Sequence, residues 1–269
     1  KPSNFQVEGE ASEGGGLTEA WFTFETATAR GRGHVRIQAD GTAWTLLTTM
    51  VELKGHEEKK GPTRARGVEH GVVPGRRNWA EERAAEAAEL GISRQPYCVI
   101  IGGGQGGIAL GARLRRLGVS TIIIEKNERP GDSWRKRYKS LCLHDPVWYD
   151  HLPYLPFPDD WPVFAPKDKI GDWLEMYTKI MELNYWPSTT ANSAKYDEAT
   201  KTWEVKVTRG GQEITLRPQQ LVLATGMSGV PNIPKFPGQD VFKGEQQHSS
   251  QHPGPDAYKG KKVVVIGSN

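Results

Sequence analysis

The sequence predicts an α/β protein with a parallel sheet, preceded by a short run of antiparallel strands. Residues 97–127 (YCVIIGGGQGGIALGARLRRLGVSTIIIEKN) read as an apolar strand, a glycine loop, a helix with leucines at helical spacing and a second apolar strand. This is one βαβ unit, whose two strands must run parallel. Residues 19–53 instead alternate partly and are rich in Thr, Val, Phe, Trp and Leu, which is typical of half-buried antiparallel strands.

The N-terminal part is predicted to contain three strands. Residues 1–17 are rich in Gly, Ser and Glu without periodicity, so we expect a loop or a disordered end. The strands are expected over 19–27, 34–39 and 42–53, separated by Gly31, Gly33 and an Asp40-Gly41 turn. Three such strands bury only one face and require partners from elsewhere.

A linker and one helix are predicted to follow. Residues 55–77 combine charges, glycines and prolines, which is linker composition. The next segment, 78–90, has Asn78 as an N-cap, Glu81 three residues later and Gly91 just past its end. Because its faces carry alanine and charge, we expect this helix to bridge rather than to fill a core.

Four further elements are predicted beyond the βαβ unit. Apolar residues at helical spacing over 170–181 indicate an amphipathic helix, and alternation from Trp203 to the Gly210-Gly211 turn indicates a hairpin. Strands are expected within 220–226 (QLVLATG) and 261–267 (KKVVVIG).

Composition excludes several classes of protein. With 35 basic and 32 acidic side chains, the net charge of +3 gives no footprint for nucleic acid. No apolar run approaches the roughly 20 residues of a membrane helix. The two cysteines, Cys98 and Cys142, match neither a metal site nor a close redox pair, so we expect a reducing, cytoplasmic location.

The glycine loop satisfies the dinucleotide-binding pattern G-x-G-x-x-G. Gly102 permits the turn from strand to helix, Gly104 allows a pyrophosphate to approach the backbone, and Gly107 allows close packing of the helix. Glu125 ends the second strand, where an acidic side chain accepts both ribose hydroxyls of an adenosine. Since Glu rather than Arg stands there, the loop is expected to hold FAD or NAD rather than NADP.

The residues after Glu125 resemble the class B flavin-dependent monooxygenases, which include flavin-containing, indole-pyruvate and Baeyer–Villiger monooxygenases. The segment 130–135 (PGDSWR) is similar to that family's G-G-x-W turn along the FAD, with Gly131 and Trp134 matching and Asp132 in place of the second glycine.

Three later segments extend the resemblance. Residues 137–146 (RYKSLCLHDP) look like the family's stretch near the flavin ring, and 223–226 (LATG) look like its crossing between nucleotide domains. Residues 242–249 (FKGEQQHS) fit its F-x-G-x-x-x-H fingerprint, although His252 replaces a later aromatic residue. The resemblance covers residues 96–269.

The resemblance implies a domain order. A Rossmann-type FAD-binding domain of three-layer ββα architecture would occupy 96–225, and 226–269 would hold the junction and the start of an NADPH-binding domain. A long-form subgroup carries a SnoaL-like α+β cone before the monooxygenase, and residues 18–54 look like its last strands. Residues 55–95 would then be the linker and bridging helix.

The resemblance also implies cofactors and site residues. NADPH reduces FAD, and the peroxyflavin formed with O₂ oxygenates a small organic substrate. No catalytic residue stands out, and His144, Asp145 and His248 are weak candidates for which a structural role is at least as favoured. The cofactor-binding residues implied are Gly102, Gly104, Gln105, Gly106, Gly107, Glu125, Lys126, Gly131, Trp134, Arg135, Leu143, His144, Thr225, Gly226, Gly267, Ser268 and Asn269.

Two alternatives stay open, and a third is disfavoured. Since the chain starts at Lys1 and stops three residues into the second glycine loop, we expect a piece of such a monooxygenase. The chain could instead be a non-catalytic FAD-binding module or short form that does not oxidise NADPH. An NAD-dependent dehydrogenase is disfavoured by the A-T-G and F-x-G-x-x-x-H segments. The substrate and the oligomeric state do not follow from the sequence.

Overall fold

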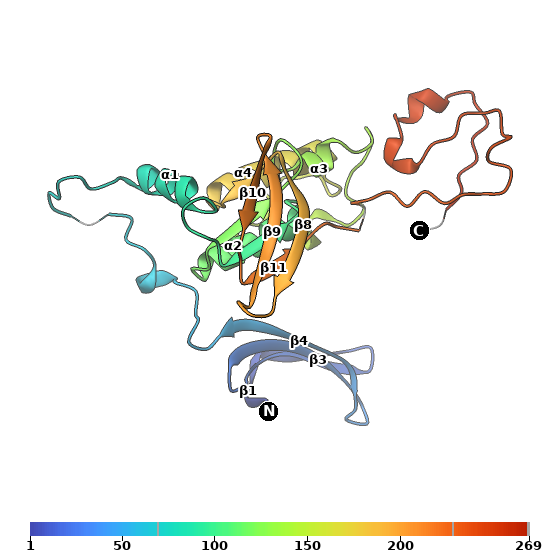
Figure 1. The fold of residues 1–269 in the computed structure, drawn as a ribbon. Coiled ribbons are helices and arrows are strands. Elements are labelled where there is room, and N and C mark those ends of the chain that lie inside the picture. The colour runs from blue at the N-terminus through green and yellow to red at the C-terminus, as the bar shows by residue number, and fades with distance from the viewer. Residues whose placement is uncertain (69, 228, 268–269) are drawn as a thin grey trace. The chain divides into compact units, whose positions relative to one another are not determined.

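The computed structural model describes residues 1–68, 70–227 and 229–267, and the chain divides into two units, Lys1–His70 and Gly71–Asn269 (Figure 1). The first unit is an antiparallel sheet in the order β1-β2-β3-β4. Its strands are β1 (Ser3–Gly14), β2 (Leu17–Glu25), β3 (Ala29–Gln38) and β4 (Ala43–Leu53).

The loop predicted over residues 1–17 is wrong, because β1 pairs with β2 along most of its length. Gly15 and Gly16 both have positive φ and form the turn between the two strands. β1 is an exposed edge strand with two register shifts, so backbone pairing rather than burial defines it. An exposed edge strand of this kind has no buried face, so hydrophobic periodicity in the sequence does not predict it.

Gly31 and Gly33 lie inside β3 and do not separate strands as predicted. Each is paired with a phenylalanine of β2, Phe24 with Gly31 and Phe22 with Gly33. A Cβ at either glycine would lie 2.3 Å from the ring opposite, so both glycines make room for aromatic side chains. The turn predicted at Asp40 and Gly41 is confirmed.

The second unit contains a parallel sheet in the order β11-β5-β6-β7, which confirms the predicted α/β class. Its strands are β5 (Cys98–Ile101), β6 (Thr121–Ile124), β7 (Tyr185–Trp186) and β11 (Gln220–Leu223). A separate antiparallel sheet has the order β10-β9-β8, with β8 (Thr189–Asp197), β9 (Thr202–Arg209) and β10 (Gln212–Leu216). The helices are α1 (Trp79–Glu89), α2 (Gln105–Arg116), α3 (Asp132–Arg135) and α4 (Lys167–Ile180), and short 3₁₀ turns are η1 (Gly61–Thr63), η2 (Val147–Tyr149), η3 (Ser249–Gln251) and η4 (Pro255–Tyr258).

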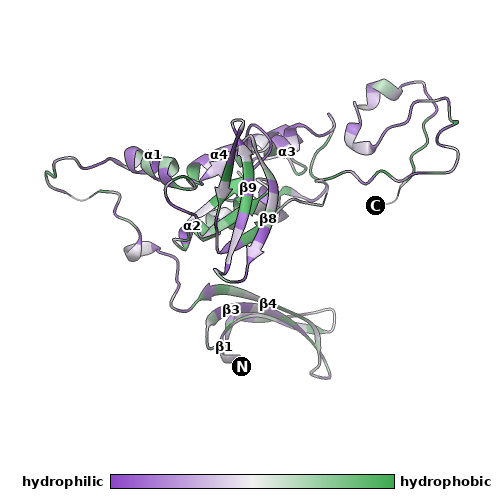
Figure 2. Cartoon of the chain, viewed as in Figure 1, coloured by the Kyte–Doolittle hydropathy of each residue, from purple (hydrophilic) through white to green (hydrophobic). Residues whose placement is uncertain are grey.

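The parallel strands are apolar on both faces, and hydrophobic residues gather at the centre of this unit (Figure 2). Val99, Ile122 and Ile124 pack against Val205 and other buried residues of the antiparallel sheet. Cys98, Ile100 and Ile123 face the leucines of α2 on the other side. The parallel sheet thus packs against buried residues of the antiparallel sheet on one face and against α2 on the other. Full burial of each such isoleucine contributes about 1.5–3 kcal/mol.

The predicted capping box of α1 is confirmed, because Asn78 and Glu81 exchange hydrogen bonds. None of the residues Trp79–Glu89 is buried, which agrees with the expectation that this helix does not fill a core. Glu86 accepts hydrogen bonds from Arg115 of α2 and from Asn184, and the Leu90 that follows is buried in the core. The second unit thus begins before residue 96. The alanine-rich helix is held by charge pairs with distant partners, which its own periodicity cannot show.

The strand predicted over 261–267 is absent, and Val263, Val264, Val265 and Ile266 are exposed. A parallel strand needs a neighbour with which to pair, and the described residues supply none for this segment. No helix within the described ranges is long and apolar enough to span a membrane.

Candidate dinucleotide site

The glycine loop connects β5 to α2, and at Gly102 and Gly107 the backbone leaves no space for a side chain. Gly102 has φ of +111°, and a Cβ there would lie 2.2 Å from the carbonyl oxygen of Ala224. A Cβ on Gly107 would lie 2.0 Å from the carbonyl oxygen of Gly102. The strand-to-helix turn expected at Gly102 and the close approach expected at Gly107 are both present.

The N-terminus of α2 is open. Gly104 is the N-cap, and a Cβ built on it has only Ser133 Oγ nearby, at 3.9 Å. As a glycine it offers no side-chain acceptor to the amides of the first turn, and that turn carries no acidic residue. Unsatisfied amides and the positive end of the helix dipole make this position suited to an anion.

Glu125 lies at the carboxyl end of β6 and is 7% exposed. Its Oε2 accepts from the Gly103 amide at 2.9 Å, and its Oε1 accepts from the backbone and side-chain nitrogens of Asn127 at 2.9 and 2.7 Å. A carboxylate has about four acceptor positions. These contacts leave about one for a ribose hydroxyl, where the sequence predicted that both would be bound.

Trp134 and Thr225 lie beside the same loop. The Trp134 indole Nε1 donates to the Gln105 side chain at 3.1 Å. The Thr225 backbone nitrogen would lie 3.1 Å from a Cβ on Gly102. The carboxyl edge of the parallel sheet thus gathers much of the predicted site, as open α/β sheets do. The predicted residues brought together here are Gly102, Gly104, Gln105, Gly106, Gly107, Glu125, Trp134 and Thr225.

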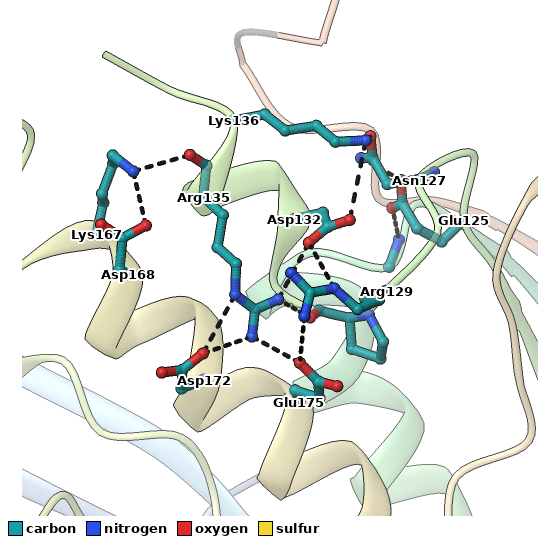
Figure 3. Close-up of polar contacts among 12 residues, drawn as sticks. Glu125, Asn127, Arg129, Asp132, Arg135, Lys136, Lys167, Asp168, Asp172 and Glu175 are labelled. Atoms are coloured by element: carbon teal, nitrogen blue, oxygen red, sulfur yellow. Dashed lines mark hydrogen bonds and ion pairs between the residues drawn. The ribbon is translucent and has the colours of Figure 1, made fainter. Parts of the chain in front are cut away.

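Arg135 belongs to an ion-pair cluster that joins α3 to α4 (Figure 3). Its guanidinium donates to Asp132, to Asp172 and Glu175 of α4, and to the Pro130 carbonyl. These contacts use all five N–H groups. In this geometry the guanidinium has no N–H left for a cofactor, and the predicted cofactor contact of Arg135 stays a prediction.

Asp132 replaces the expected glycine without disrupting the turn. Its side chain is 6% exposed and pairs with Arg135 at 3.1 Å and with Arg129 at 3.5 Å (Figure 3). Gly131 has φ of +85°, and a Cβ there would lie 2.1 Å from the Gly171 carbonyl oxygen. Gly131 is thus required for the contact with α4.

The other residues predicted to bind cofactor make none of the hydrogen bonds described above for the glycine loop. Lys126 is exposed, whereas Leu143 packs against the core that contains α4 and donates its amide to Ala165. Gly226 and Gly267 are exposed. Ser268 and Asn269 fall outside the described residues.

The weak catalytic candidates have ordinary surroundings. His144 is 94% exposed and lies 3.6 Å from the Asp145 carboxylate. His248 caps η3, and its Nδ1 accepts from the Ser250 amide at 3.2 Å. The structural hydrogen-bonding role favoured for His248 is present. Nowhere in the described ranges do three His, Cys, Asp or Glu side chains group to hold a metal.

Tyr185 was missed by sequence reasoning. Its hydroxyl donates to the Gly103 carbonyl at 2.9 Å, although it lies 82 residues further along the chain. It belongs to β7, which is only two residues long. Such a strand gives no period, so no pattern in the sequence could have identified this contact.

Comparison with known proteins gives one family and several relatives. The model of the flavin-binding monooxygenase-like family matches residues 124–269. Indole-3-pyruvate monooxygenase YUCCA1 of Oryza sativa is 35% identical over 173 residues, which cover 64% of this chain and 42% of the rice protein. The chain thus spans less than half the length of this curated relative.

Two solved structures share the fold. A flavin-containing monooxygenase from Stenotrophomonas maltophilia matches with a TM-score of 0.56 and 26% identity, covering 61% of this chain and 48% of that one. The OTEMO complex with FAD and NADP matches with a TM-score of 0.50 and 27% identity, covering 60% of this chain and 31% of that one.

Proposed function

The chain belongs to the flavin-binding monooxygenase-like family, and we propose that residues 79–225 form the FAD-binding part of an FAD- and NADPH-dependent monooxygenase that acts on a small organic substrate. The observation that carries this proposal is the glycine loop at the N-terminus of α2. Gly102 and Gly107 exclude side chains, while the space beside Gly104 is open. This is the shape that a pyrophosphate requires.

The chain's own residues suit each part of FAD. The first-turn amides of α2 would receive the pyrophosphate, and the Glu125 carboxylate would accept a ribose hydroxyl. Trp134, fixed by its hydrogen bond to Gln105, provides an aromatic wall beside the loop. The flavin, once bound, supplies the redox chemistry with NADPH as reductant and O₂ as oxidant. The protein's part is to bind, orient and exclude water.

The proposal has support from the name of one relative and from the cofactors bound to a structural neighbour. The rice relative is an indole-3-pyruvate monooxygenase, and OTEMO is a structural neighbour solved with FAD and NADP. We assign no residue of this chain to NADPH, because Ser268 and Asn269 lie outside the described residues and Gly267 is exposed.

FAD reconstitution tests the proposal. The purified chain is expected to take up FAD with quenched flavin fluorescence and to release it on denaturation. Gly104→Asp places a carboxylate where the pyrophosphate would lie, and Asp is also a favoured N-cap. This variant should therefore stay folded and lose FAD binding. Gln212→Glu, which adds the same charge on the exposed part of β10, serves as its control.

The outcomes separate the open alternatives. A folded chain that takes up no FAD would contradict the proposal, and so would Gly104→Asp binding FAD as well as the control. FAD uptake without oxidation of NADPH would favour a non-catalytic module or short form.

A further inference from the structure

Gly103 stands at a variable position of the G-x-G-x-x-G pattern, yet with Tyr185 in its observed position there is no space for a side chain there. A Cβ on Gly103 would lie 2.1 Å from the Tyr185 hydroxyl oxygen and 2.5 Å from its ring. Its φ is not positive, so the requirement is for space and not for an unusual backbone conformation. The close approach of Tyr185 therefore accounts for the third consecutive glycine of the loop.

Both backbone polar groups of Gly103 are fixed by side chains from other strands. The amide donates to Glu125 Oε2 at 2.9 Å, and the carbonyl accepts from the Tyr185 hydroxyl at 2.9 Å. These partners come from the ends of neighbouring strands β6 and β7. The loop is thus held on two sides immediately before the N-cap of α2.

The orientation of one peptide follows from this arrangement. The Gly103 carbonyl and the Gly104 amide belong to the same peptide, and in a trans peptide they point in opposite directions. Because Tyr185 holds the carbonyl, the Gly104 N–H is directed away from Tyr185 and the core behind it. An anion at the start of α2 requires amides presented in this way.

Tyr185 is itself well placed to act as a permanent donor. β7 pairs with β6 so that Tyr185 lies opposite Ile123, and its ring packs against the core between β5, β6 and α2. Burial, with the nearby negative charges of Glu125 and Asp132, raises the pKa of the hydroxyl. The proton needed for the bond to Gly103 is therefore present throughout the physiological range.

We propose that Tyr185 is a positioning residue of the dinucleotide site, which orients the peptide between Gly103 and Gly104 so that the Gly104 amide faces the pyrophosphate of the cofactor. This inference rests on the proposed binding of FAD. It assigns a role in cofactor affinity to a residue outside the glycine loop and outside the segments that carry the family resemblance.

Tyr185→Phe tests the proposal, because it removes the hydroxyl and keeps the ring. Tyr177→Phe is a matched control, since the Tyr177 hydroxyl also donates to a backbone carbonyl, that of Pro153, at 2.6 Å. Titration with FAD and urea unfolding without FAD are measured for both. Tyr185→Phe is expected to raise the Kd for FAD about 5–10-fold, since one hydrogen bond contributes about 1 kcal/mol. The Kd of Tyr177→Phe should stay within about twofold of the wild-type value.

The results separate a positioning role from a merely structural one. Equal Kd values for Tyr185→Phe and the wild type would overturn the inference, as would equal losses in both variants. A wild-type chain that binds no FAD would overturn the proposed function as well. If Tyr185→Phe does not fold, Gly103→Ala replaces it, because its methyl group displaces the hydroxyl. An unchanged Kd in that variant would then overturn the inference.

Discussion

Alanine at two adjacent glycines of α2 should change stability in opposite directions. Gly106 and Gly107 are both helical, and neither has a positive φ. A Cβ on Gly106 meets no atom within 4 Å, whereas one on Gly107 would lie 2.0 Å from the Gly102 carbonyl oxygen. The same substitution therefore tests the close approach with helix propensity held constant.

The magnitudes follow from two effects. Replacing glycine by alanine inside a helix gains about 0.5–1 kcal/mol, so Gly106→Ala is expected to stabilise the chain by that amount. Gly107→Ala gains the same but forces a backbone shift, and overpacking of this kind costs about 1–3 kcal/mol. With contact against a backbone atom, the upper end applies, and the net loss is about 2 kcal/mol.

Urea unfolding followed by tryptophan fluorescence measures the difference. With a slope near 2 kcal/mol per M, a gap of about 3 kcal/mol between the variants separates their midpoints by about 1.5 M. Unchanged slopes would show that the compactness of the unfolded state is the same. A Gly107→Ala variant as stable as Gly106→Ala would refute the loop geometry described here.

Three further predictions concern charges and thiols. Arg135→Ala should lower the free energy of unfolding by about 2–4 kcal/mol because it removes the cation nearest to the buried Asp132. Asp172→Ala, at a side chain 79% exposed, should cost under about 0.5 kcal/mol. Equal losses of the two variants in urea unfolding would contradict the ion-pair geometry described for Arg135. Burial alone raises the pKa of Glu86, but hydrogen bonds from Asn184 and Arg115 lower it below its ordinary value. The stability that Glu86 contributes is therefore present at pH values above its pKa in the unfolded chain and is lost as the pH falls through its pKa in the folded chain. Glu86→Gln removes this titration, so the unfolding free energy of the variant should decline less steeply between about pH 5 and 3. Burial raises the pKa of the Cys98 thiol to about 11, so a thiol reagent at neutral pH should modify only the exposed Cys142 in the native chain and both in denaturant; two modified thiols without denaturant would count against the core.

What the sequence predicted well are features written in local spacing. The βαβ unit, the amphipathic helix α4, the hairpin at Gly210 and Gly211, and the capping box of α1 are each recognised from patterns within one continuous stretch of sequence. These patterns can be read from the sequence because they depend on the local spacing of residues and not on tertiary partners.

The errors share a different cause. β1 is defined by a partner strand, and the segment at 261–267 is apolar but has no described neighbour with which to pair. The sequence also does not show that Arg135 pairs with Asp172 and Glu175 of α4, about 40 residues away. Single-sequence patterns contain no information about these partners.

The glycine loop itself is a tertiary feature, despite its regular spacing. Ala224 limits the space at Gly102, Tyr185 limits it at Gly103, and the Gly102 carbonyl limits it at Gly107. Two of these three constraints come from residues more than 80 positions further along the chain than the glycines they limit. Because the tight positions depend on β7 and on the end of β11, the loop can hold its shape only where the chain from β5 through Ala224 has folded. The spacing of the glycines indicates a dinucleotide site. The packing of β7 and of Ala224, which follows β11, explains why Gly102 and Gly103 have no space for a side chain.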